Sequence, residues 1–337
     1  MHCVPWGETA VVNGRNIVFL MLTLLTPPSA KAASDAVFAW QTDAQAGTTD
    51  LTYGKVPVLR YMHGFDRSTP DAAHATYKVY HHVFGPDGGP LITKGPGGLY
   101  THHRGLYLGW NKTGFDGQVN DFWHCRNGEH IRHVRFVEQS ADRSRGQMTA
   151  EIHWVDTQGK LVIQEMRTVS VSLLKTSAET PPGWQIEWST KLKSQRGDIT
   201  LRGDRQHAGF QFRAAQEVAA AKGARYIRPA GFPEQAAAFQ VGDKDQPPKH
   251  VDLGWLAMTF QVQKKRYTVE YFSDPDLPKP ARYSERPYGR FGAYFRTKLT
   301  VEKPLVMRYR VNVTTGAAPS RAEIQKRYDA FLESLKS

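Results

Sequence analysis

Short segments of alternating polar and apolar residues, each followed by turn residues, constrain this sequence most strongly. Gln147–Val155 (QMTAEIHWV) alternates in this way, and residues 156–159 (DTQG) turn the chain into Leu161–Leu174. Alternate side chains point to opposite faces of a strand, so a period of two is typical of a sheet with one buried face. Further candidate strands occur at 76–84, 90–93, 129–139, 185–194, 209–213, 255–263, 267–272, 293–301 and 305–313.

Roughly a dozen such strands, separated by turns rich in Gly, Pro and Asp, favour an all-β fold. The sequence shows no strand–helix–strand rhythm and contains neither G-x-x-x-x-G-K-[ST] nor G-x-G-x-x-G, which argues against a doubly wound nucleotide-binding fold. No internal repeat or low-complexity linker divides the chain. We therefore expect one domain, residues 33–337, folded as a large antiparallel β-sandwich.

Two segments predict helices. The first is the alanine-rich stretch at 214–222. The second is the C-terminal segment 320–335, where Ser320 can cap the helix, Glu323 follows three residues later, and an apolar stripe runs along one side. We expect this C-terminal helix to pack on the outside of the sheets, and residues 229–248 to form a loop.

Residues 1–32 predict a signal peptide. Ile17–Leu25 is an apolar run of nine residues that follows Arg15, and Ala30-Lys31-Ala32 offers small residues at the two positions that a signal peptidase reads. Nine residues are too few to cross a bilayer, which takes about 20. No other apolar run approaches that length, so we expect a soluble, periplasmic or secreted protein without a membrane span.

The mature chain would keep one cysteine and a strongly positive charge. Cys3 leaves with the signal peptide, so Cys125 has no partner for an intramolecular disulfide. The net charge of +12 becomes about +11, which favours acidic partners electrostatically. The basic residues are scattered, with no dense cluster among aromatic residues, so we expect no binding to nucleic acid.

Side chains suited to chemistry are densest between residues 102 and 133, which hold five of the 13 histidines. The segment YTHHRGLYLGW (100–110) sets His102, His103 and Arg104 side by side. Neighbours in a strand point to opposite faces, so we expect one imidazole of the pair to face a cleft and the other to support it. The flat aromatic side chains of this region that could pack against sugar rings are Trp110, Phe122 and Trp123.

A metal site is an open alternative, because imidazole and carboxylate groups are suitable zinc ligands. However, the sequence contains no H-E-x-x-H, and the adjacent His102 and His103 are poorly placed to bind one ion together. We therefore expect no bound cofactor and no metal-ligand set.

Three further groups could contribute to a site. His207 lies near Asp204 in a turn that is expected before the strand at 209–213. Glu165 and Arg167 share one face of a strand, which fits either a salt bridge or a catalytic carboxylate. The third group, within SERPYGRFGAYF (284–295), consists of Arg286, Tyr288 and Arg290.

Several segments together resemble a known family. They are YHHVFGPDGGPLITKGPGGLYTHHRGLYLGWNKTGFDG (80–117), NDFWHC (120–125), GDRQHAGFQFR (203–213), RPYGRFGAYF (286–295) and MRYRVNVTTG (307–316). They are similar to exported bacterial proteins of unknown function that are labelled PmoA-like or "methane oxygenase PmoA", over most of the mature chain. The methane monooxygenase subunit of that name is an integral membrane protein, whereas this sequence predicts no membrane helix, so methane oxidation is excluded.

The resemblance implies a secreted β-sandwich protein from bacteria that consume complex polysaccharides. The size and the many strands suit a galactose-mutarotase-like supersandwich, a fold that includes epimerases and polysaccharide lyases. We hypothesise an exported carbohydrate-active enzyme, a hydrolase, lyase or epimerase, that uses imidazole as proton donor and acceptor. An acidic substrate such as a uronic-acid polymer would suit the positive charge of the chain.

The expected catalytic residues are His103 as general acid/base, His207 as its opposing partner, Arg104 as a stabiliser of negative charge, and Glu165. The expected substrate-binding residues are His102, Trp110, Asp121, Trp123, His124, Arg286, Tyr288 and Arg290. Two other functions stay open. A non-catalytic glycan-binding protein would use the same aromatic and arginine side chains, and a metal-dependent oxidoreductase would carry iron or copper.

Overall fold

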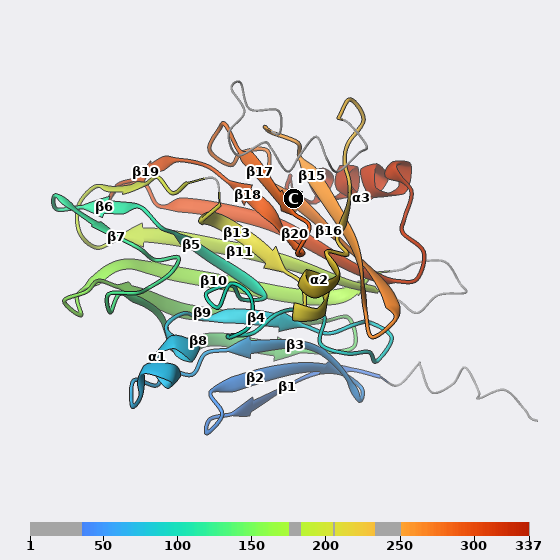
Figure 1. Ribbon diagram of the computed structural model, residues 1–337, viewed down its shortest axis with the longest axis horizontal. Coiled ribbons are helices and arrows are strands. Elements are labelled where there is room, and N and C mark those ends of the chain that lie inside the picture. Colours follow the sequence, from blue (N-terminus) through green and yellow to red (C-terminus); the bar gives the residue numbers. More distant parts are fainter. Residues whose placement is uncertain (1–35, 175–182, 205, 233–250, 337) are drawn as a thin grey trace, which may run out of the picture. The chain divides into compact units, whose positions relative to one another are not determined.

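Antiparallel sheets make up most of the structure (Figure 1). The computed structural model describes residues 36–174, 183–204, 206–232 and 251–336, and the expected signal peptide lies outside these residues. Residues 36–337 form one compact unit. Every ladder between the named strands is antiparallel, so the all-β class and the large antiparallel sandwich are confirmed.

The described residues form two sheets of eight strands each and a small sheet of four. The first sheet, in spatial order, contains β1 (Phe38–Asp43), β2 (Thr48–Tyr53), β3 (Val56–Met62), β4 (Tyr80–Val83), β5 (Leu106–Trp110), β13 (Ala208–Arg213), β18 (Arg290–Tyr294) and β17 (Arg282–Arg286). The second contains β14 (Arg225–Ile227), β15 (Trp255–Val262), β16 (Lys265–Ser273), β20 (Leu305–Thr315), β11 (Gly183–Ser194), β10 (Leu161–Leu174), β9 (Arg145–Val155) and β8 (His130–Ala141). The small sheet contains β19 (Thr297–Leu299), β12 (Ile199–Leu201), β6 (Thr113–Phe115) and β7 (Gln118–Asn120).

The two large sheets share one hydrophobic core. Phe210 of the first sheet and Trp188 of the second are both buried, and their ring centroids lie 4.5 Å apart. Along β5 and β13 every second residue belongs to this core, as the period of two in the sequence requires. The core residues of these two strands are Leu106, Leu108, Trp110, Ala208, Phe210 and Phe212.

The opposite face of the first sheet, which we call its outer face, is polar and positions the candidate site. Tyr107 on β5 pairs in register with Gln211 on β13, and Arg213 pairs with Arg290 on β18. All four side chains are buried although they alternate with the core residues. Other parts of the chain must therefore cover this face.

Glycine lets one covering segment approach the outer face closely. A Cβ atom at Gly109, on β5, would lie 2.5 Å from the carbonyl oxygen of Phe122, which is closer than real Cβ contacts. The segment around Phe122 therefore passes directly over β5 because position 109 has no side chain. Asp121 and His124 lie in this same segment.

Within the described ranges, three helices accompany the sheets. α3 (Arg321–Ser334) begins with the predicted capping box between Ser320 and Glu323, and its Ile324 and Phe331 pack against Trp255 and Phe272 of the second sheet. The C-terminal helix is thus confirmed. α2 (Gln216–Ala221) matches the predicted alanine-rich helix. No helix of the described residues is long and apolar enough to cross a membrane.

The helix α1 (Pro70–Thr76) was not predicted. Thr69 caps it by accepting a hydrogen bond from the backbone N of Ala72, and Pro70 occupies its first turn. The strand expected at 76–84 is correspondingly shorter, since β4 covers only Tyr80–Val83. Most of the loop expected at 229–248 lies outside the described residues.

Candidate metal centre

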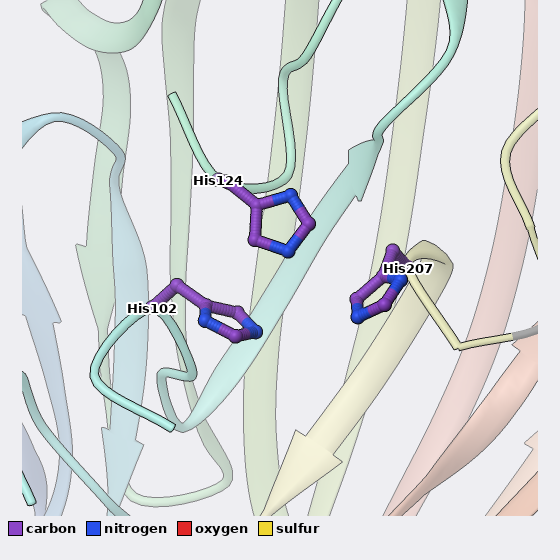
Figure 2. Close-up of side chains that lie close together, drawn as sticks. All are labelled: His102, His124 and His207. Carbon is purple, nitrogen blue, oxygen red and sulfur yellow. The ribbon is translucent and has the colours of Figure 1, made fainter. Parts of the chain in front are cut away.

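Three histidines that are far apart in the sequence meet beside β5 and β13. His102 precedes β5, His124 lies between β7 and β8, and His207 immediately precedes β13. The ring centroid of His124 lies 4.5 Å from that of His102 and 4.7 Å from that of His207, and the other two are 6.0 Å apart. Figure 2 shows each ring turning a nitrogen toward the space between them. One ligating atom from each residue lies within 4.8 Å of the other two.

Two of these rings are each held at Nδ1 by a carboxylate of their own. Asp121 Oδ2 lies 2.7 Å from His124 Nδ1, and the two carboxylate oxygens of Asp204 lie 2.9 and 3.0 Å from His207 Nδ1. Because an ionised carboxylate only accepts, Nδ1 carries the proton and the Nε2 lone pair stays free for a ligand. Metal-binding histidines are oriented by such carboxylates in many proteins.

Both carboxylates are themselves fixed by further hydrogen bonds. Asp121 Oδ1 accepts from the backbone N atoms of Trp123 and His124, and Asp204 Oδ2 accepts from Asn111 Nδ2 at 2.7 Å. Burial would raise the pKa of either carboxyl group, but hydrogen bonds and the neighbouring histidine outweigh it and lower both pKa values. Both groups are therefore ionised at neutral pH and can orient their histidines.

His102 completes the group as a neutral ring. Burial, with the nearby positive charges of Lys78 and Arg290, lowers the pKa of His102 to about 2. Its buried Nε2 atom has no hydrogen-bond partner among the described residues. A buried polar atom without a partner is costly, and bonding to a metal ion would satisfy it.

These side chains fit a divalent transition metal. Imidazole nitrogens suit zinc, copper, iron and nickel, and three-histidine zinc sites of the catalytic type leave a fourth position for water or substrate. Zn–N bonds of about 2.0–2.1 Å would draw the three rings closer together. The expectation that no metal-ligand set exists rested on the absence of H-E-x-x-H and on the adjacency of His102 and His103, but the group contains only His102 of that pair and draws its other members from distant segments.

The two adjacent histidines, His102 and His103, differ in their surroundings. They lie in a loop and not in a strand, with ring centroids 4.4 Å apart. His102 faces His124 and His207, whereas His103 is 2% exposed and its ring is stacked at 5.9 Å on that of Tyr288. Burial and several nearby cations hold the pKa of His103 well below its usual value. Its acid/base role stays a prediction, and the structure places His102, not His103, against His207.

Arg104 and Trp110 do not face the three histidines. The guanidinium of the fully buried Arg104 donates to the backbone carbonyls of Thr101, His103 and His74, so it stabilises the loop and is not available for developing substrate charge. Trp110 lies in the core with its Nε1 atom donating to a backbone carbonyl, and cannot be a surface for sugar rings.

Glu165 also lies away from this group, on β10 of the second sheet. It is fully buried and accepts hydrogen bonds from Arg167 Nε, Trp154 Nε1 and Thr190 Oγ1 at 2.7 to 2.8 Å. The salt bridge that the sequence allowed is therefore present. Among the described residues, no hydrogen bond or ion pair joins Glu165 to the three histidines, so the geometry favours the structural interpretation over the catalytic one.

The remaining predicted site residues lie at different distances from the three histidines. Trp123 is fully buried, with its ring 6.1 Å from that of His207. Tyr288 contacts His103, and Arg290 donates to the Tyr288 hydroxyl. Arg286 lies on the edge strand β17, where it pairs in register with Arg290 of β18. Asp121 and His124, expected to bind substrate, instead form one of the carboxylate–histidine pairs.

The role of Asp204 was not predicted, although the sequence carries a signal for it. The pattern D-x-x-H occurs at both pairs, 121–124 and 204–207, and also at 71–74. The third copy lies on α1, where no hydrogen bond between Asp71 and His74 is found in the described part of the chain. The pattern therefore suggests a carboxylate–histidine pair only when the chain turns back on itself in a loop.

We expect Asp204→Asn to weaken metal binding by about 10–100-fold, because loss of an orienting carboxylate has this effect in metal sites. Competition with a chelator of known affinity measures the change. Asp71→Asn, which alters the third copy of the pattern, serves as the control and should bind metal as the unaltered chain does. Equal affinities for all three proteins would show that Asp204 does not support a metal ligand.

Comparisons with known proteins give a family and distant structural similarity. No curated protein sequence matches the chain. A heparinase III with methylated lysines is similar in structure, with a TM-score of 0.33 and 7% identity over 83% of this chain and 36% of that one. A protein described as a kojibiose phosphorylase from the human microbiome has a TM-score of 0.35 and 9% identity over 86% of this chain and 32% of its own. This chain thus spans about a third of the length of either protein.

The sequence itself shows the relationship more directly. The profile of a family described only as a family of unknown function matches residues 48–329, which include all three histidines and both carboxylates of the candidate metal centre. This chain therefore belongs to that family of unknown function, DUF6807.

Proposed function

We propose that this chain is an exported, metal-dependent enzyme that acts on carbohydrates. The observation that carries the proposal is the convergence of His102, His124 and His207 with a carboxylate on the Nδ1 atom of two of them. A purely glycan-binding protein has no need of three converging imidazoles, two of which are held in orientation by carboxylates. The substrate class and the export come from the PmoA-like resemblance and from the apolar segment at 17–25, and are parts of the same proposal.

The residues of the site would have two roles, as metal ligands and as groups that orient those ligands. A bound divalent metal would lower the pKa of a coordinated water to about 7, or polarise a substrate oxygen. His102, His124 and His207 would hold it, while Asp121 and Asp204 keep two of the rings in the right tautomer. Hydrolysis, elimination and epimerisation of sugars each need a base near neutral pH, so this arrangement suits all three reaction classes.

The test is metal analysis combined with a carbohydrate screen. We expect the purified chain to contain about one transition-metal ion per molecule and to lose turnover of its oligosaccharide substrate on treatment with a chelator, with recovery when metal is restored. Mass spectrometry of a panel of oligosaccharides, with and without chelator, measures this. A chain that binds glycans but contains no metal and converts none of them would support the non-catalytic alternative.

A metal-dependent oxidoreductase is the second candidate, because the same three imidazoles also suit iron and copper. The identity of the metal separates the two functions. Zinc would exclude electron transfer at the metal, whereas iron or copper that changes oxidation state during turnover would favour the oxidoreductase. Electron paramagnetic resonance of the purified chain distinguishes these outcomes.

A further inference from the structure

The outer face of the first sheet carries two buried arginines without an acidic partner. Arg213 and Arg290 are 0% and 1% exposed. Arg290 donates to Tyr288, Gln211 and Ser284, all of them neutral, and Arg213 Nη1 donates to the backbone carbonyls of Ala214 and Tyr288. No ion pair with a carboxylate is found for either arginine within the described ranges. Burial of a charge is costly unless it is paired, so this face favours an anion.

The edge of the Arg213 guanidinium that can bind a carboxylate is unoccupied by the described residues. Its Nε and Nη2 atoms are buried and have no hydrogen-bond partner in the described part of the protein. These two N–H groups form the parallel fork that binds both oxygens of a carboxylate. Because Nη1 is held by two carbonyls, the fork is fixed in orientation.

Other buried polar atoms without partners surround the same region. They are Nδ1 of His103, the hydroxyl of Tyr107 and Nε1 of Trp123, and none of them meets a hydrogen-bonding atom of the residues that the structure describes. The ring centroid of Tyr107 lies 4.7 Å from that of Trp123 and 6.5 Å from that of His103. Buried polar atoms are nearly always paired, so a group of them beside an unoccupied guanidinium fork indicates a polar ligand.

This region lies next to the candidate metal centre. His103 contacts His102 on one side and Tyr288 on the other, and the guanidinium of Arg213 lies 5.1 Å from the centre of the Tyr288 ring. Trp123 contacts both Tyr107 and His207. A sugar residue could therefore meet the fork at one end and the three histidines at the other.

We propose that Arg213, Tyr107 and Trp123 bind the carboxylate of an acidic sugar, so that the substrate of the metal centre is a uronic-acid-containing carbohydrate. The inference rests on the proposed function for its carbohydrate, but the carboxylate site itself does not require the metal. Tyr288 separates Arg213 from the exposed ring of Tyr100, with the two tyrosine centroids 4.6 Å apart. The acidic sugar enters past these two rings.

The experiment measures binding of D-glucuronate and D-glucose to the purified chain by calorimetry, with and without metal. Glucuronate is expected to bind and glucose to bind at least about tenfold more weakly, since a hydrogen-bonded charge pair gives a difference of this size. Tyr107→Phe removes only a hydroxyl that has no hydrogen-bond partner among the described residues, so the fold should be kept or stabilised while glucuronate affinity falls by about tenfold. Arg213→Lys keeps the charge but removes the fork, and should weaken glucuronate further.

Tyr80→Phe is the matched control, because Tyr80 packs in the same aromatic cluster as Tyr107 and Trp123 but its hydroxyl is paired with His82 Nε2. It should leave glucuronate affinity unchanged. Equal binding of glucuronate and glucose, or unchanged affinity in a folded Tyr107→Phe chain, would overturn the inference. So would chloride competing with glucuronate at equal strength, which would indicate a trapped inorganic ion. A chain that contains metal but shows no preference for glucuronate refutes this inference alone, whereas a chain that prefers glucuronate but takes up no metal when metal is supplied refutes the metal-dependent function alone.

Discussion

His102→Ala is expected to remove stoichiometric metal from the purified chain and to lower metal affinity by more than about 100-fold. Loss of an orienting carboxylate alone costs about 10–100-fold, and loss of a ligand removes a bond as well. His102 is the most informative of the three ligands because its Nε2 atom has no hydrogen-bond partner in the part of the chain that the structure describes. Removing it leaves no carboxylate unpaired, so the metal-free chain should unfold at a similar or higher denaturant concentration.

Mass spectrometry of the metal content and chelator competition check the first part, and urea unfolding of the metal-free chain checks the second. His153→Ala is the control. Like His124 and His207, His153 is paired with a carboxylate, Glu151, but it lies outside the group of three. It should bind metal normally. If His102→Ala kept full metal content while remaining folded, the three histidines would not be the metal site, and the proposed function would lose its support.

The fold was predictable because its determinants are local. Turn residues and a period of two describe most strands, and a capping box with an apolar stripe describes α3. The alternation of polar and apolar residues also indicates that two of the predicted site residues point into the core. Leu106, Leu108 and Trp110 share one face of β5, so Trp110 had to join the core, and Glu165 shares a face of β10 with the core residues Ile163 and Val169.

The site was predictable only in part, because it depends on contacts between distant segments. The sequence identified the histidine-rich segment and His207, but not which of the two adjacent imidazoles faces the site. That choice is made by the loop, whose shape depends on Arg104 bonding to the carbonyl of His74, about 30 positions away in the sequence. The role of Asp204 likewise depends on Asn111, from a different strand connection. The local signal was the repeated D-x-x-H pattern.

Glu165→Ala is expected to lower the free energy of unfolding by about 3–5 kcal/mol, because it leaves Arg167 as an unpaired charge inside the core. Both residues of this pair are buried, with side chains 0% and 1% exposed. The substitution also removes the acceptor for Trp154 and Thr190. Urea or guanidinium unfolding of the metal-free chain measures the loss. Metal content should stay the same under conditions where the variant is folded.

Two further variants separate the buried charge from the rest of the effect. Asp50→Asn breaks the ion pair with Arg60, whose side chain is 41% exposed, and should cost no more than about 1 kcal/mol. The double variant Glu165→Leu with Arg167→Met removes both charges, and should recover most of the stability that Glu165→Ala loses, since apolar residues of similar volume often replace a buried pair without cost.

If Glu165→Ala instead kept its stability but abolished turnover, Glu165 would be a catalytic carboxylate, and the site would have to extend through the core between the sheets. The position of Glu165 beneath Trp154 and beside Arg167 opposes that outcome, because a substrate would have to displace packed side chains to reach it.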